Sequence, residues 1–171
     1  MTIHGNSCGG DVNAGISIAN MIQALNEKGI MTTAILEGIA ASIASVVVCA
    51  CKKIKMYESS FVMIHKCWSI VQGNSEELRK EADVMDKLNK AIMKFYHKKF
   101  DLTDEQLEDY MKAETWICGA EIADYKFNAE LISEKHQYKI AASIKNKKFN
   151  NIPKDLIMDE NKEKEEEQKV E

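Results

Sequence analysis

Short β-branched or apolar runs alternate along this chain with longer segments whose apolar residues recur every three or four positions. Segment 11–29 is of the second kind and ends at Gly29, whereas segment 30–36 is a short β-branched run that predicts a buried strand. Segments 53–57 and 61–65 predict two further strands. Strands and helices that alternate bury their apolar faces in layers, so the order of these segments indicates an α/β fold.

Three helices are predicted in the second half of the chain. Segment 74–100 forms a long one, which opens with Asn74 and Glu77 as a capping box. Its apolar stripe consists of Leu78, Ala82, Met85, Leu88, Ile92 and Phe95. Segment 103–113 begins with a second box formed by Thr103 and Gln106, and segment 119–127 predicts a short helix.

Composition excludes several classes of function. The 171 residues suit one domain with a real core, and the net charge of −4 provides no general electrostatic footprint for nucleic acid. We find no apolar run long enough to cross a membrane and no signal peptide. The five cysteines have neither disulfide nor zinc-finger spacing, and Cys49 and Cys51 fall within an apolar stretch. We therefore expect reduced thiols, no metal site and a cytoplasmic protein.

Residues 38–45, with the sequence GIAASIAS, are nearly all small. They lie where a β-like run meets the apolar segment 42–51, which has strand propensity but is preceded by residues that suit the start of a buried helix. Two interpretations are open. Small side chains allow two backbones to pack closely, with Ser42 as a simple N-cap. Alternatively, Ser42 is a reactive serine at the first turn of a helix, in a position too tight for larger neighbours.

Three other stretches carry groups suited to chemistry. They are 6–15 with a double glycine, 61–68 with His65, and 113–121 with Glu114. Taken alone, each has a structural interpretation: a turn, a satisfied structural histidine and a solvated carboxylate. A serine hydroxyl is a poor nucleophile until a base removes its proton, and His65 is the one histidine placed at a strand end beside the other motifs.

Together these motifs resemble the proteolytic subunit of the Clp protease, and more narrowly the related head-maturation proteases of phages and prophages. The matching stretches occur in the family's order: Asn6-Ser7-Cys8-Gly9-Gly10, Gly38-Ile39-Ala40-Ala41-Ser42, Met63-Ile64-His65 and Glu114-Thr115-Trp116. The resemblance implies a spiral of ββα units, as in Clp proteolytic subunits and crotonases, with a long handle helix and with the first unit partly missing. It implies a protease domain over 1–135, followed by a charged and flexible tail over 136–171.

The resemblance also implies a site. Ser42 is the nucleophile, His65 the base and Glu114 the third member of the triad. The backbone amides of Gly9 or Gly10 and of Ile43 form the oxyanion hole. Substrate backbone pairs with an extended segment matched by three residues before the long helix: Val71, Gln72 and Gly73.

Partners follow from the same resemblance. The substrate is a polypeptide, a capsid or scaffold protein if the phage branch holds, and cleavage takes place in the host cytoplasm or the prohead. Subunits form a homo-oligomeric ring, or two stacked rings joined by the handles. The peptidase subunit needs no cofactor, and any Clp-type ATPase is a partner; nucleic acid and membrane are not expected to bind.

Departures from the family pattern keep other functions open. Cys8 replaces the proline of the glycine turn, which puts a thiol near the expected oxyanion hole, and residues 125–129 lack the family's late glycine and aspartate. The chain begins only a few residues before the glycine turn, without the strands and helix that precede it in the family. One alternative is therefore a catalytically inactive ring or assembly component. A crotonase-type acyl-CoA enzyme, which needs amides but no triad, is the other.

Overall fold

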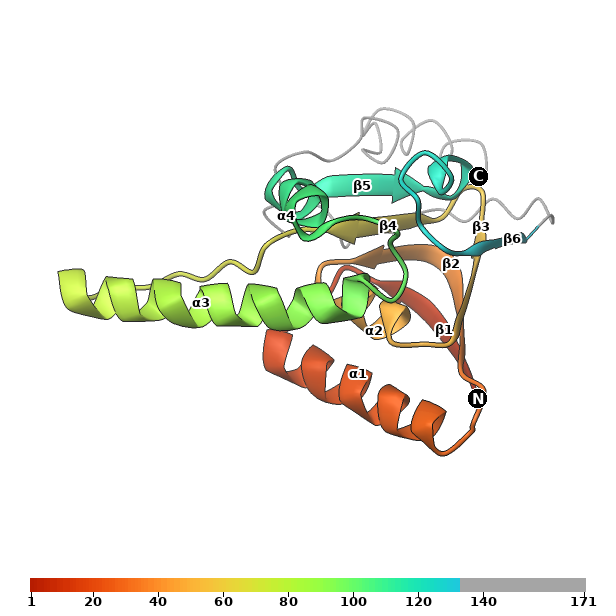
Figure 1. Cartoon of the computed structure of the whole chain (residues 1–171), viewed down its shortest axis with the longest axis horizontal. Coiled ribbons are helices and arrows are strands. Elements are labelled where there is room, and N and C mark those ends of the chain that lie inside the picture. Colours follow the sequence, from red (N-terminus) through yellow and green to blue (C-terminus); the bar gives the residue numbers. More distant parts are fainter. Residues whose placement is uncertain (133–171) are drawn as a thin grey trace, which may run out of the picture.

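The computed structural model of the chain describes residues 1–132 (Figure 1). In chain order its elements are β1 (Thr2–Ser7), α1 (Val12–Glu27), β2 (Thr33–Ala41), α2 (Ile43–Cys49), β3 (Lys53–Tyr57), β4 (Phe61–Ile64), α3 (Ser75–Tyr96), α4 (Asp104–Lys112), β5 (Thr115–Cys118), a 3₁₀ turn (Gly119–Glu121) and β6 (Glu130–Ile132). The mixed α/β fold predicted from the sequence is confirmed. The tail expected over 136–171 lies outside the described residues.

Strand β2 is the centre of the six-stranded sheet that the described residues form. Its first half, residues 33–36, pairs in parallel with β1 and with β3, whereas residues 39–41 pair in parallel with β4. Strand β5 is antiparallel to β4, and β6 is parallel to β3, which gives the order β5-β4-β2-β3-β6 with β1 also on β2. Because β3 pairs with the first half of β2 and β4 with the second, the sheet is curled (Figure 1).

Both faces are buried in β4 and in the second half of β2, which explains why these stretches carry apolar or small residues at successive positions. In β4, Val62 and Ile64 belong to the main core with the helices, whereas Phe61 and Met63 face the other way. The second face forms a smaller cluster, which we call the Trp116 cluster: Cys8, Ile39, Ala41, Phe61, Met63 and Trp116. The ends of β2 and β4 are thus held firmly from both sides.

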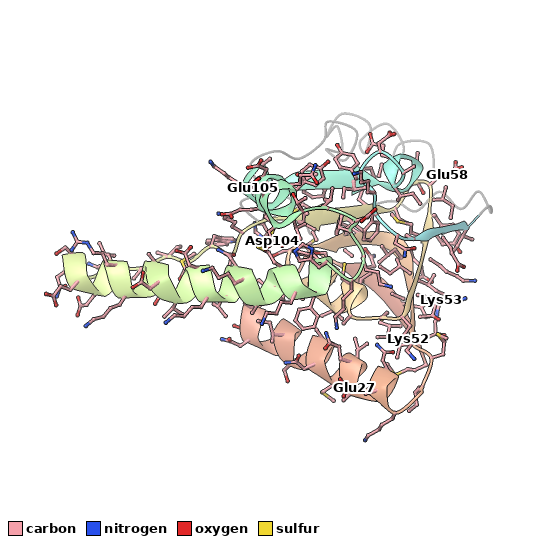
Figure 2. All side chains as sticks on the ribbon, in the orientation of Figure 1. Glu27, Lys52, Lys53, Glu58, Asp104 and Glu105 are labelled. Atoms are coloured by element: carbon pink, nitrogen blue, oxygen red, sulfur yellow. The ribbon has the colours of Figure 1, made fainter. Side chains whose placement is uncertain are left out.

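Helix α3 joins the body only along its second half. Its buried residues, from Asn89 to Tyr96, lie near the C-terminal end. The first half projects beyond the rest of the described chain, with side chains spread into solvent (Figures 1 and 2). Leu78 and Val84 are 44% and 46% exposed there. The capping boxes predicted at Asn74 and at Thr103 are both present.

The structure corrects several boundaries. Strands β1, β5 and β6 were not predicted, since they have six, four and three residues and too little periodicity to identify. The strand expected over 30–36 runs instead from Thr33 to Ala41. The prediction of a helix over 119–127 was wrong: only a 3₁₀ turn forms, at the start of that segment. The ambiguous segment 42–51 is the helix α2.

The end of α3 is joined to the start of α4 by a polar contact. His97 Nε2 lies 2.8 Å from Asp104 Oδ1, and Figure 2 labels Asp104 at this junction. In the described part of the chain, no helix has the length and apolar character needed to cross a membrane. No group of three or more acidic, histidine or cysteine side chains within residues 1–132 could hold a metal ion, and the five cysteines form no disulfide.

Candidate active site

Ser42 occupies the single-residue turn between β2 and α2. Its backbone has φ 58° and ψ −133°, a combination that non-glycine residues rarely adopt and that costs about 1–3 kcal/mol. The surrounding structure fixes this conformation, because the Ser42 N–H donates to the Met63 carbonyl at 3.0 Å. The strained turn directs the side chain of Ser42 toward the end of the neighbouring strand β4.

His65 directly follows β4 and meets Ser42. The pairing of Ala41 with Met63 aligns the ends of β2 and β4, so the next residues of both strands emerge side by side. His65 Nε2 lies 2.7 Å from Ser42 Oγ, which is hydrogen-bonding distance. The structure therefore brings together two residues that the sequence analysis selected 23 positions apart.

Glu114 approaches the same histidine from β5. Strands β4 and β5 are antiparallel and pair Ile64 with Thr115. His65, which follows Ile64, and Glu114, which precedes Thr115, therefore lie opposite each other at one end of the ladder. Burial lowers the pKa of His65, and the negative charge of Glu114 partly opposes this shift by stabilising the imidazolium. Glu114 has φ 54° and directly precedes strand β5.

The glycine turn packs directly against Ser42. Gly9 has φ +89°, and a Cβ added to it would lie 2.7 Å from Ser42 Cβ and 3.2 Å from the Ile43 nitrogen. A Cβ on Gly10 would meet no described atom within 4 Å. Of the two glycines, Gly9 is therefore the one whose missing side chain permits the close approach to the peptide between Ser42 and Ile43.

Small residues maintain this packing on either side. A side chain at Gly38 would collide with Asn6 Oδ1 at 2.7 Å, and that oxygen accepts a hydrogen bond from the Ile39 N–H at 3.3 Å. On α1, a side chain at Gly15 would overlap Ile43. The small stretch 38–45 thus serves both close packing and the presentation of Ser42. The interpretation of Ser42 as a simple N-cap is wrong, because its side chain makes no capping hydrogen bond and contacts His65 instead.

A cavity of about 360 Å³ adjoins the glycine turn between β1, α1 and α2. Gly9, Gly10 and Ile43 are among its lining residues, but Ser42 and His65 are not. The cavity therefore lies beside the reactive pair rather than enclosing it.

Cys8 does not share the exposure of Ser42. Its side chain is 6% exposed and packs in the Trp116 cluster. A thiol nucleophile needs access to its substrate as well as ionisation, so this position does not favour Cys8 as the reacting group.

The candidate substrate segment lies in irregular backbone between β4 and α3. Val71, Gln72 and Gly73 are all exposed. The segment's start is held to α3, because Asn89 Oδ1 accepts hydrogen bonds from the backbone N–H and the Sγ of Cys67, both at 2.8 Å. The three predicted residues thus lie on the chain that leads away from His65.

Two residues that the sequence analysis did not single out are linked to the Ser42 backbone, Ser45 directly and Tyr96 through Ser45. Ser45 Oγ donates to the Ser42 carbonyl at 2.6 Å and also contacts Tyr96 Oη at 2.8 Å. Ser45 follows Ser42 by three positions, a spacing typical of contact within a first helical turn. No feature of the sequence indicates the partner Tyr96, which is 51 residues further along the chain.

A serine hydroxyl bonded to a histidine at the ends of adjacent strands, beside a strained turn and a glycine loop, is the arrangement of the serine hydrolases. The sequence model described as "Clp protease" matches residues 1–135, so the chain belongs to the Clp protease family. The family resemblance stated from the motifs is confirmed at this level.

Two curated relatives bear the name ATP-dependent Clp protease proteolytic subunit. The protein from Deinococcus radiodurans is 28% identical over 134 residues, which cover 77% of this chain and 64% of the relative. The protein from Bigelowiella natans is 28% identical over 122 residues, covering 70% of this chain and 61% of the relative. The chain spans less than two thirds of the length of either relative.

Proposed function

We propose that this chain is a serine endopeptidase subunit that hydrolyses peptide bonds through Ser42, His65 and Glu114. The observation that carries the proposal is the 2.7 Å contact between Ser42 Oγ and His65 Nε2, made by a serine held in a strained turn. Membership of the Clp protease family supports the same activity.

In the first step, His65 Nε2 removes the proton from Ser42 Oγ as the oxygen attacks the substrate carbonyl carbon. A neutral imidazole is required, and the burial that lowers the pKa of His65 favours this form at neutral pH. The charge of Glu114 then stabilises the imidazolium, which donates its proton to the departing amine. Water, activated by the same histidine, hydrolyses the acyl-enzyme and regenerates the serine.

The tetrahedral intermediate carries a negative oxygen that needs nearby donors. We assign this role to the amide of Ile43 and to that of Gly9 or Gly10. The close approach of Gly9 to the Ser42–Ile43 peptide supports the assignment, because two donors must converge on one oxygen. Loss of one such donor typically lowers the rate by ~10²–10³.

Substrate binding is proposed for residues 71–73, before α3. Their exposure leaves backbone groups accessible to an extended polypeptide, which would add as a strand. Recognition of this kind depends mainly on the main chain and therefore suits a protease of broad sequence preference.

Assembly into a ring, or into two stacked rings, is part of the proposal. The projecting half of α3 exposes Leu78 and Val84, and the segment before it exposes Trp68 and Ile70 at 58% and 85%. Apolar side chains gathered on a projecting element favour contact with another subunit. A Clp-type ATPase is a further candidate partner, as the names of the relatives mention ATP dependence.

The finer assignment is to the phage and prophage head-maturation branch. The motif Glu114-Thr115-Trp116 supports it, and it implies capsid or scaffold proteins as substrates in the prohead or host cytoplasm. We also propose residues 1–135 as the protease domain.

An inactive ring or assembly component is the competing function, favoured by the departures from the family pattern at Cys8 and over residues 125–129. Labelling with a fluorophosphonate distinguishes the two. An active subunit forms a covalent adduct that is absent in Ser42→Ala and unchanged in Ser17→Ala, a serine exposed on α1. Ring formation without labelling would contradict the peptidase and favour the assembly role, whereas binding of coenzyme A would favour the crotonase alternative.

A further inference from the structure

A buried chain of hydrogen bonds runs from the end of α3 to the nucleophile's backbone. Ser45 Oγ lies 2.6 Å from the Ser42 carbonyl oxygen and 2.8 Å from Tyr96 Oη. A carbonyl oxygen can only accept, so the single hydroxyl proton of Ser45 is used in the first contact. Tyr96 must then donate in the second, and the direction of the chain is fixed from Tyr96 through Ser45 to Ser42.

The Ser42 carbonyl receives a second donor from the same residue. The backbone N–H of Ser45 also donates to it, at 3.0 Å. The carbonyl of Ser42 and the N–H of Ile43 belong to one planar peptide and point in opposite directions. Donors that hold the carbonyl toward the helix therefore also direct the Ile43 N–H away from it, on the side where Gly9 approaches.

This peptide needs such restraint. It follows a residue with φ 58°, where rotation of the peptide is an available way to relieve backbone strain. Ser45 is fully buried and Tyr96 is 1% exposed, so each hydroxyl would lose its partner without gaining water if the peptide rotated. Burial also raises the pKa of Tyr96, which keeps its hydroxyl protonated as the donor at the head of the chain.

We propose that Ser45 and Tyr96 are positioning residues for the oxyanion hole, which hold the Ser42–Ile43 peptide with its N–H toward the substrate oxygen. This inference rests on the proposed peptidase activity. It also gives the attached half of α3 a role in the chemistry, because Tyr96 is the last residue of that helix.

The test compares Ser45→Ala, Tyr96→Phe and the double variant in the full chain. The readouts are the second-order rate of fluorophosphonate labelling, kcat and KM on a peptide substrate, and the pH midpoint of labelling. We expect Ser45→Ala to lower the labelling rate and kcat about tenfold, less than outright loss of an oxyanion donor. Tyr96→Phe should lower both about threefold, with KM and the pH midpoint unchanged in each variant.

The double variant shows whether the two residues act in series. If Tyr96 acts only through Ser45, the double variant should react as slowly as Ser45→Ala and no slower. If the two substitutions lower the labelling rate independently and their effects add in the double variant, the proposal that Tyr96 acts through Ser45 is overturned. If Ser45→Ala does not fold, Tyr96→Phe, which removes one oxygen atom, carries the test with the same expected threefold loss.

Two matched controls separate positioning from stability. Ser60 is another fully buried serine, whose Oγ donates to the Leu36 carbonyl at 2.8 Å, away from the site. Tyr125 is a half-buried tyrosine whose ring packs against Tyr110. Ser60→Ala and Tyr125→Phe should lower the thermal midpoint or leave it unchanged, and should keep the wild-type labelling rate. Equal slowing by Ser60→Ala would show a general loss of packing and overturn the inference.

The two proposals fail differently. If the wild type labels at Ser42 and both Ser45→Ala and Tyr96→Phe label at the same rate, the positioning role is wrong and the peptidase stands. If the wild type does not label at any pH while remaining folded, the peptidase is wrong and the positioning role falls with it.

Discussion

The substitution Gly9→Ala tests how closely the glycine turn approaches the nucleophile. The added methyl group would lie 2.7 Å from Ser42 Cβ and 2.8 Å from the Ala41 carbonyl oxygen. Ser42 forms the strained turn and Ala41 is the last residue of β2 directly before it, so neither can move without displacing the Ser42 side chain. We expect a loss of stability together with a loss of labelling at Ser42.

The expected magnitude has two parts. Alanine at a positive φ costs about 1–2 kcal/mol, and forcing a methyl group into packed atoms costs about 1–3 kcal/mol more. Gly29 isolates the first part, because it has φ +80° and an added Cβ would meet no described atom within 4 Å. Gly9→Ala should therefore lower the free energy of unfolding by about 2–5 kcal/mol and Gly29→Ala by only about 1–2 kcal/mol.

Urea unfolding measures both variants, and fluorophosphonate labelling under folded conditions measures the effect on Ser42. Gly9→Ala should label at least tenfold more slowly, whereas Gly29→Ala should label at the wild-type rate. Equal unfolding free energies for the two variants, with normal labelling of Gly9→Ala, would refute the close approach of the turn to Ser42.

Further perturbations also have expected outcomes. Because burial lowers the pKa of His65, the rate of labelling should rise with pH through a midpoint below the ordinary value of 6.5. Glu114→Gln removes the charge that stabilises the imidazolium and should move this midpoint lower still. An upward shift of the midpoint would contradict the charge effect assigned to Glu114. As the pH falls, His65 is protonated in the unfolded chain at a higher pH than in the folded chain, because folding lowers its pKa. The contribution of His65 to the free energy of unfolding should therefore be lost as the pH falls below 6.5 toward the pKa of the folded state. Thr103→Ala should cost about 1 kcal/mol of global stability, while Asn74→Ala, at the projecting end of α3, should only accelerate amide exchange in the first turn. Asn89→Ala removes a buried acceptor shared by two donors of Cys67 and should lower the free energy of unfolding in urea by about 1–3 kcal/mol. An unchanged free energy of unfolding would contradict this prediction and show that water replaces the acceptor.

Patterns with a local physical cause could be predicted from the sequence. The capping boxes at Asn74 and Thr103 depend on residues three positions apart, and both formed. The short strands β1 and β5 could not be predicted, because six and four residues show too little alternation and their existence depends on pairing with β2 and β4. The prediction of a helix over 119–127 was wrong, because the composition of this segment does not distinguish a helix from the series of turns that forms there.

The candidate site shows the same division. Ser42 and His65 could be selected because each ends a strand in a motif, and the register of β2 with β4 brings them together. Tyr96, which reaches the site from another helix, carries no such local mark. Tyr96 looks like one more apolar-face residue of a long helix, and only the packing of α3 on the body brings its hydroxyl to Ser45.

The backbone of Ser42 also bears on how such a sequence would drift over generations. Glycine adopts this combination of φ and ψ without steric penalty, so replacing Ser42 by glycine would relieve the backbone strain that every active copy of the protein retains. A lineage that no longer needed the hydroxyl would find glycine there favourable for folding. Retention of serine at this position, across descendants of this gene, would therefore be a signature of selection for reactivity at the expense of stability.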